Sequence, residues 1–334
     1  MTKVQMAPLS SRLALIAGSG RSGTSFLAKL IDASSDVLYR HEPDISARTK
    51  EFPQLPDCSN PELYADIARA YLYDLTWQRD SRTMGSTPIY SKRFRSSLAN
   101  RAMPALVYGA KALERVRLPA RVPDLIENGR EPLVLIKSVS SVLRTPIFAH
   151  AVPSLKVIHI VRHPCAVLAS QIRGIKRGLM QSSDFTDELF SVPDAHNYGL
   201  SKEQIVAAPF EVQRAFRWMV HNDAVYRRLK DHPNYIFISY EKLCVELQSE
   251  SKRLCEFLNM PIDDQMANYV RLVTEDGTKD GGYFSVIKNT LSALSKWEDE
   301  VDPDVAASVI DLVQGSEIGR KTLAEYATQR AKLV

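Results

Sequence analysis

The sequence lacks any apolar run long enough to cross a bilayer, which takes about 20 residues of helix. Its first apolar run, residues 13–17, stops at a glycine and is too short for the core of a signal peptide. The four cysteines include no CxxC pair and show no spacing with the seven histidines that suits zinc or a disulfide framework. These absences predict a soluble cytoplasmic protein that holds no metal.

An excess of charge of one sign is also missing. Lys and Arg number 43 against 39 Asp and Glu, a formal net charge of +4. We therefore expect no nucleic-acid partner, although a small anionic ligand would suit this weakly basic chain. The 334 residues are 45% hydrophobic and 25% charged, without internal repeats. That composition is ordinary for a globular protein, and we expect a single domain over residues 1–334.

Short apolar runs alternate along the chain with longer segments of helical periodicity. This alternation predicts an α/β fold of three layers, a central parallel sheet flanked by helices. Ligands of such sheets bind beyond the carboxyl ends of the strands, so the residues that follow each strand are the candidates for function. The expected strands are 13–17, 37–39, 132–137, 156–161 and 234–239, and the expected helices are 24–32, 61–77, 141–151, 164–173, 209–230, 241–259, 303–314 and 318–332.

Residues 92–130 differ in character, and we interpret them as a basic helical insertion. In their first part, 92–121, eight cations accompany Glu114 alone. The charged face is either merely solvated, or it forms a lid or surface that meets an anionic acceptor or makes peripheral contact with a membrane. The mostly polar stretch 178–208 is predicted to form a loop or mobile flap near the site.

The loop GSGRSGTS, residues 18–25, lies between an expected strand and an expected helix. Its backbone N–H groups and the positive end of the helix would meet at one point, which is how proteins cradle an anion. Nucleoside-triphosphate loops of the pattern GxxxxGK[ST] need a lysine where this chain has Thr24, and the cation here is Arg21 instead. The strand 156–161 also ends at Arg162, where a kinase would need an acidic magnesium ligand. A tight turn without a ligand is the alternative.

Two motifs together resemble those of sulfotransferases that use 3′-phosphoadenosine 5′-phosphosulfate (PAPS). GSGRSGTSFLAKLIDAS resembles the loop that holds the 5′-phosphosulfate, and KVIHIVRHPCAVLAS resembles the second signature, a strand ending in arginine with a serine eight positions on. The resemblance spans most of the chain and implies a P-loop-like fold with PAPS as co-substrate. It implies that Arg162 and Ser170 grip the 3′-phosphate. The loop residues that it assigns to the cofactor are Gly20, Arg21, Ser22, Gly23, Thr24 and Ser25.

A base for the acceptor hydroxyl is expected just after the second strand, in YRHEPD, residues 39–44. Glu42 would stand at the carboxyl edge of the sheet, and a glutamate with its ordinary pKa of about 4.3 is ionised at neutral pH. Carbohydrate and protein-tyrosine sulfotransferases carry a glutamate at this distance from the first loop, so the resemblance also points to Glu42. The alternatives are His41 as the base, or a structural salt bridge of Glu42 with Arg40 or Arg21.

Lys137 ends the expected strand 132–137, again at the carboxyl edge. The resemblance to tyrosylprotein sulfotransferases implies that a lysine at this interval before Arg162 assists departure of the leaving oxygen. An ordinary exposed lysine at a strand end is the alternative. With Arg21, which would stabilise the charge that moves onto the leaving nucleotide, the expected catalytic set is Glu42, Lys137 and Arg21.

Weaker matches complete the expected site. Tyr240 in NYIFISYEKLCVE and Lys288 in GTKDGGYFSVIKNTLSALSKW lie in segments that resemble cofactor contacts of the family. Packing is the alternative for Tyr240, and Trp297 is expected in the core. Arg173 and Lys176 add positive charge near Ser170 either as phosphate ligands or as a solvated helix face.

The expected function is transfer of a sulfuryl group from PAPS to an acceptor hydroxyl, with no metal ion required. A carbohydrate or glycolipid is the first expectation for the acceptor, and a peptide tyrosine or small phenol is the second. A P-loop kinase and a non-catalytic protein that binds phosphorylated nucleotides are the rival functions. A homodimer is left open.

Overall fold

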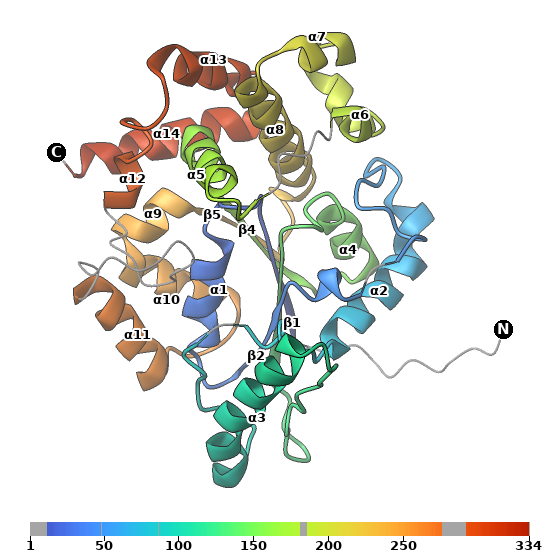
Figure 1. Ribbon diagram of the computed structural model, residues 1–334, viewed down its shortest axis with the longest axis vertical. Coiled ribbons are helices and arrows are strands. Elements are labelled where there is room, and N and C mark those ends of the chain that lie inside the picture. Colours follow the sequence, from blue (N-terminus) through green and yellow to red (C-terminus); the bar gives the residue numbers. More distant parts are fainter. Residues whose placement is uncertain (1–11, 48, 86, 181–185, 276–291, 334) are drawn as a thin grey trace.

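The computed structural model describes residues 12–47, 49–85, 87–180, 186–275 and 292–333 (Figure 1). At its centre is a five-stranded parallel sheet in the order β2-β3-β1-β4-β5. Each expected run forms a strand, and the α/β prediction is confirmed. The strands are β1 (Leu13–Ala17), β2 (Val37–His41), β3 (Leu133–Ser138), β4 (Lys156–Val161) and β5 (Tyr235–Ser239).

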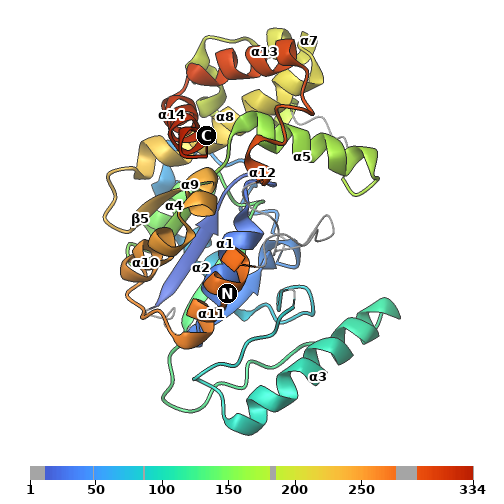
Figure 2. The ribbon, with the colours of Figure 1, turned by 90° about the vertical axis from the view of Figure 1, so that its left-hand side faces the viewer.

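Helices surround this sheet (Figures 1 and 2). None of those in the described residues is both long and apolar enough to cross a bilayer. The longer ones are α1 (Thr24–Asp32), α2 (Ala65–Trp77), α3 (Ser97–Arg115), α4 (Thr145–Ala151), α5 (Pro164–Lys176), α8 (Phe210–Leu229), α9 (Tyr240–Val245), α10 (Leu247–Phe257), α11 (Asp264–Glu275), α13 (Pro303–Gln314) and α14 (Glu317–Ala331). The shorter ones are η1 (Pro43–Ile45), η2 (Pro61–Tyr64), α6 (Thr186–Leu189), η3 (Pro193–Tyr198), α7 (Lys202–Ala207) and α12 (Ser292–Ser295).

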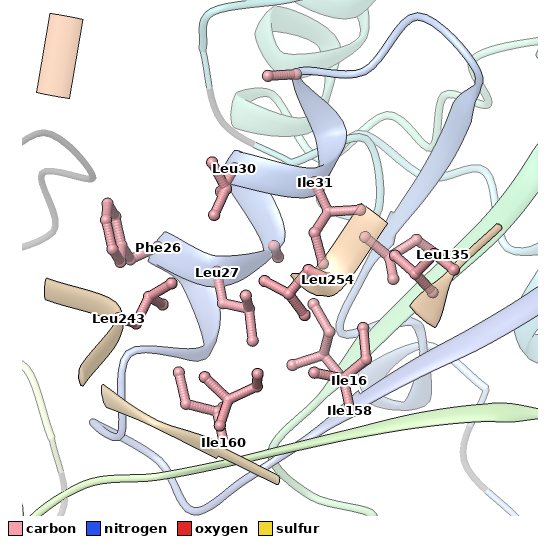
Figure 3. Close-up of a cluster of buried hydrophobic side chains, with 14 of the residues drawn as sticks. Ile16, Phe26, Leu27, Leu30, Ile31, Leu135, Ile158, Ile160, Leu243 and Leu254 are labelled. Carbon is pink, nitrogen blue, oxygen red and sulfur yellow. The ribbon is translucent and has the colours of Figure 1, made fainter. Parts of the chain in front are cut away.

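The sheet is covered on both faces, and most positions of its strands are apolar. All of β1 is buried. Ala14 and Ile16 pack in the cluster that contains α1, α9, α10 and α11, whereas Leu13 and Leu15 pack in the cluster that contains α2 and α4. Figure 3 shows the first cluster, where side chains of α1 meet Ile16 of β1. This packing holds α1, and therefore the loop before it, against the sheet.

Part of the segment expected to be a flap is packed. Within 178–208, the described residues from 186 onward form α6, η3 and α7. Leu189, Val192 and Ile205 are buried in one cluster with Phe216 of α8. The prediction of a loop is wrong for these residues, because a few apolar side chains spaced among polar ones were enough to anchor short helices.

Several helices differ from those expected. The expected helix 241–259 is divided at Glu246, whose φ of −117° and ψ of 42° lie outside the helical region, into α9 and α10. The helix α11 was not expected, although its buried Met266, Tyr269 and Val273 recur every three or four residues. That spacing was the available signal for this helix.

The basic insertion is only partly a charged surface. Lys92 is buried, and its Nζ donates to the carbonyl oxygens of Asp32 and Ser34 and to a carboxylate oxygen of Asp32. It thereby caps the carboxyl end of α1 with a cation. Arg95 is also buried, and its Nε donates to the carbonyl of Asp124 at 2.7 Å. The expectation that 92–121 is one solvated or ligand-facing surface is therefore wrong for these two cations.

Lys92→Met is expected to lower the free energy of unfolding by about 3 kcal/mol, because it leaves the buried Asp32 carboxylate with Lys29 as its remaining ion-pair partner. Burial by itself would raise the pKa of Asp32, but Lys92 and Lys29 hold it below its ordinary value. Urea unfolding measures the loss. The control Arg93→Met removes a cation whose side chain is largely exposed and lies 3.9 Å from Asp36, and should cost less than about 1 kcal/mol. Equal stability of the two variants would contradict this account.

Candidate active site

A predicted site residue lies at or just after the carboxyl end of every strand of the sheet. The loop 18–25 follows β1, Glu42 follows β2, Lys137 lies at the end of β3, Arg162 follows β4 and Tyr240 follows β5. Because all five strands are parallel, their carboxyl ends meet at one edge of the sheet. The topology thus brings together residues that are far apart in the sequence.

The loop after β1 turns tightly and depends on two glycines. Gly23 has a φ of 89°, and a Cβ there would lie 2.2 Å from the ring of Tyr240. A Cβ on Gly18 would lie 2.4 Å from the carbonyl oxygen of Ile160. Arg21 also takes a left-handed conformation, with a φ of 75°, which is uncommon for a residue with a side chain. The loop is therefore pressed against β4 and the start of α9.

The inside of this loop suits an anion. α1 begins at Thr24 without a side-chain cap, so the backbone N–H groups of its first turn remain available to a ligand. Ser22 is fully buried, and its Oγ has no hydrogen-bond partner among the described residues. The position of a Cβ on Gly20 is open space. A buried hydroxyl without a partner, beside a helix N-terminus, is a donor of the kind that a site for a ligand with oxygen acceptors needs.

The two sequence motifs meet in space. Arg21 Nε donates to Ser170 Oγ at 2.9 Å, which ties the loop to α5. Arg162 Nη1 donates to the carbonyl oxygen of Arg21 at 3.5 Å, and its guanidinium lies 4.4 Å from the ring centre of Tyr240. The cations expected at the two ends of one ligand thus belong to one continuous site.

Buried polar side chains that the sequence analysis missed hold this site in place. Asn222 of α8 donates to Ser19 Oγ at 2.9 Å and lies 3.1 Å from Nε2 of His159, whose Nδ1 is 2.9 Å from the hydroxyl of Tyr235. Burial lowers the pKa of His159 to about 4, so this histidine is neutral at pH 7. The available signal was an asparagine on the apolar face of an expected helix, since a buried amide needs partners.

A second missed group positions the arginine motif. Glu241 is buried, and it accepts a hydrogen bond of 2.9 Å from the backbone N–H of His163. Burial raises the pKa of Glu241 despite hydrogen bonds and the positive charge of Arg162 nearby. His163 stacks on Trp297 at 4.5 Å, and Trp297 is buried, as expected for a core residue. The residues that flank Arg162 are fixed by packing.

Glu42 and Lys137 form an ion pair at the edge of the sheet. The Lys137 side chain is 2% exposed and that of Glu42 is 20% exposed, so the interpretation of Lys137 as an exposed lysine is wrong. Burial would raise the pKa of Glu42, but Lys137 holds it below the ordinary value, and Glu42 is ionised at neutral pH. Glu42 has a φ of 45° and donates its N–H to the carbonyl of Lys137 at 2.8 Å. A left-handed glutamate is a local strain of the kind found at functional sites.

The expected alternatives for Glu42 are not supported by its contacts. Arg40 is fully buried and pairs with Asp124 at 2.7 Å, so it is no partner of Glu42. Arg21 contacts Ser170, as described above. His41 Nδ1 lies 2.7 Å from the hydroxyl of Tyr39, and burial, followed by the charge of Lys137, lowers the pKa of His41 to about 4. His41 is therefore a neutral, weakly basic group whose Nδ1 is already engaged.

Of the remaining expected cofactor residues, Tyr240 is buried and packs on both Gly23 and Arg162. Thr24 is buried and Ser25 is exposed at the start of α1. Lys288 lies outside the described residues. Arg173 pairs with Glu300, which gives it a structural contact.

A cavity of about 610 Å³ lies between the segments that follow β2, α2 and α3. Ser46, one turn of chain beyond Glu42, lines it, and so does Arg82, whose charge lowers the pKa of Glu42. Trp77 and Glu114 contribute from α2 and α3. In the part of the chain that the structure describes, no group of three or more His, Cys, Asp or Glu side chains is placed to hold a metal ion.

Comparison with known proteins agrees with this geometry. Residues 14–264 match the model of the sulfotransferase family. The chain belongs to the sulfotransferase family. It is 22% identical over 331 residues to carbohydrate sulfotransferase 1 of Mus musculus. The aligned region covers 88% of this chain and 75% of the mouse protein.

Solved structures of sulfotransferases are also similar to this one. The sulfotransferase domain from the curacin biosynthetic pathway is 16% identical, with a TM-score of 0.46, over 92% of this chain and 99% of that domain. The structure of mouse sulfotransferase SULT7A1 complexed with 3′-phosphoadenosine 5′-phosphate (PAP) is 14% identical, with a TM-score of 0.44. The match covers 95% of this chain and 89% of the mouse chain.

Gly23→Ala in this sulfotransferase is expected to lower the free energy of unfolding by about 2–4 kcal/mol, because the new Cβ needs a strained φ and collides with Tyr240. Thermal unfolding monitored by circular dichroism checks this. Gly20→Ala is the matched control in the same loop, where a Cβ meets open space, and should unfold within about 1 kcal/mol of the wild type. An equal loss of unfolding free energy in both variants would show that the contact with Tyr240 does not exclude a side chain at residue 23.

Proposed function

We propose that this sulfotransferase moves a sulfuryl group from PAPS to an acceptor hydroxyl. The observation that supports this most is the convergence of Arg162, Arg21 and Ser170 on a loop that contains a buried hydroxyl without a partner, Ser22 Oγ. A ligand with phosphate groups at two places fits these donors, since one group would meet the loop N–H groups and the other Arg162. PAPS supplies the activated sulfuryl group when it is bound.

The residues of the chain have distinct tasks in this proposal. The loop residues Gly20 to Ser25 and the N-terminus of α1 hold the 5′ end of the cofactor, and Arg162 with Ser170 holds the 3′-phosphate. Glu42 accepts the proton of the acceptor hydroxyl at its carboxylate. Lys137, which already contacts Glu42, supplies positive charge where negative charge develops on departure of the nucleotide. Arg21 orients the loop through its bond to Ser170.

The acceptor that we propose is a carbohydrate or glycolipid hydroxyl. The mouse relative is named a carbohydrate sulfotransferase, and the cavity that Ser46 and Arg82 line has polar and charged side chains together with Trp77. Such a lining suits a ligand with several hydroxyl groups, which needs hydrogen-bond partners and a flat apolar surface. A peptide tyrosine or small phenol is the second proposal.

Incubation of the protein with sulfur-labelled PAPS and fractionated cell extract tests the proposal. Label should enter a glycan or glycolipid fraction, and the transfer should proceed in the presence of a metal chelator. Label in peptide tyrosine would favour the second acceptor. Phosphate transfer from ATP without any sulfuryl transfer would contradict the proposed function.

A further inference from the structure

The helix α3 carries an apolar stripe that nothing in the described part of the chain covers. Met103, Val107 and Ala110 face inward and form a small cluster with Val122. Figure 2 shows α3 lying apart from the helices that cover the sheet. Its outward side exposes Leu98, Ala105, Leu106, Ala112 and Leu113, and Val116 is exposed just after the helix ends.

The segment 98–118, which contains this stripe, is a concentration of exposed apolar side chains rather than a scatter. Fourteen large apolar residues are exposed among the described ones, and six of them fall within 98–118. Single exposed apolar residues are normal on a protein surface, but a contiguous group marks an interaction site. The six are Leu98, Leu106, Tyr108, Leu113, Val116 and Leu118.

Cations border the stripe. Arg101 and Arg115 are exposed on α3, and Arg117 and Arg121 are exposed just beyond its end. Glu114 is the one acidic residue between Lys92 and Arg121, and it bonds to Ser81. An apolar face rimmed by arginines complements a surface that is apolar inside and anionic at its rim, which describes a membrane with acidic headgroups.

We propose that α3 docks this protein onto anionic lipid surfaces. A second copy of the chain is a poorer occupant, because two α3 helices packed through this stripe would bring arginines of both copies together, and the single acidic residue of the helix, Glu114, is already bonded to Ser81. Docking also has a consequence for substrate access. Glu114 of α3 and residues 119–121 line the cavity that Ser46 and Arg82 also line, so a hydroxyl carried by a lipid of the same surface would be presented at that cavity.

Co-sedimentation of the full chain with lipid vesicles, without any sulfuryl donor, tests the docking independently of the proposed function. The wild type should bind vesicles of phosphatidylcholine containing phosphatidylserine at least about 10-fold more tightly than vesicles of phosphatidylcholine alone. The triple variant Leu106→Ser, Leu113→Ser, Val116→Ser should lose about 30-fold or more of this binding, because the apolar side chains that would enter the lipid are gone. The double variant Arg101→Gln, Arg115→Gln should lose the preference for phosphatidylserine.

The matched control replaces three apolar residues of comparable exposure on other surfaces, Leu63→Ser, Val206→Ser and Ile262→Ser. It should bind vesicles like the wild type. Light scattering after size exclusion reports the oligomeric state of each variant. The proposal is overturned if the wild type does not bind anionic vesicles, if the control loses as much binding as the stripe variant, or if the stripe variant dissociates a dimer while vesicle binding is unchanged.

Discussion

Glu42→Gln is expected to lower kcat for sulfuryl transfer by on the order of 10³-fold, the contribution typical of a general base. The amide keeps the shape of the side chain and still accepts a hydrogen bond from Lys137, but it cannot take the acceptor proton. The dissociation constant for 3′-phosphoadenosine 5′-phosphate (PAP), the nucleotide that remains after transfer, should change by less than about 3-fold, because Glu42 is assigned to the acceptor side. Steady-state kinetics and calorimetric binding measure the two effects.

His41→Gln is the control for this experiment. His41 is neutral with a pKa of about 4, and its Nδ1 already lies beside the hydroxyl of Tyr39, so its loss should reduce kcat by less than about 5-fold. If kcat fell strongly in His41→Gln and stayed near normal in Glu42→Gln, His41 and not Glu42 would be the general base. Circular dichroism must show that both variants are folded, since Lys137 is buried next to Glu42.

Arg162→Ala should weaken binding of PAP by about 100-fold, the effect of losing a charge-assisted hydrogen bond to phosphate in a partly buried site. The guanidinium is held by its contact with Tyr240 and by its bond to the Arg21 carbonyl, so little side-chain entropy is lost on binding. Adenosine 5′-phosphate, which lacks the 3′-phosphate, isolates the contact. The wild type should prefer PAP strongly, and the variant should bind the two nucleotides almost equally.

Arg173→Ala is the matched control, because Arg173 lies on the adjacent α5 but pairs with Glu300. It should keep the preference for the 3′-phosphate. If Arg162→Ala weakened the binding of both nucleotides to the same degree, Arg162 would act on the loop rather than on the 3′-phosphate. If Arg173→Ala alone lost the preference, the assignment would move to α5.

Local patterns in the sequence were sufficient to predict the strands and the main helices of the fold. The run LALIA became a strand, and the pattern after it became a helix at Thr24–Asp32, because the spacing of apolar residues along the chain indicates such elements locally. The sequence also predicted the edge of the sheet at which the candidate site lies. Parallel strands put their carboxyl ends together, so Glu42 and Arg162 could be expected on the same side.

The partners of charged side chains were less predictable. Arg40 was a candidate partner of Glu42, yet Arg40 is buried against Asp124, and Glu42 leaves the strand in a left-handed conformation. Lys92 was counted with a basic surface, yet it closes the end of α1. These pairs join segments that the sequence separates widely, and no local spacing reveals them.

The amino-acid sequence by itself determined the five strands and most of the longer helices, the tight turn after β1 and the family to which this chain is similar, because each depends on neighbouring residues. Tertiary structure alone decided that Lys137 is the counterion of Glu42, that Asn222 braces Ser19, and that the apolar face of α3 stays outside the core. The reason is physical. Burial and charge pairing depend on which distant segments meet, and only the packed chain specifies that.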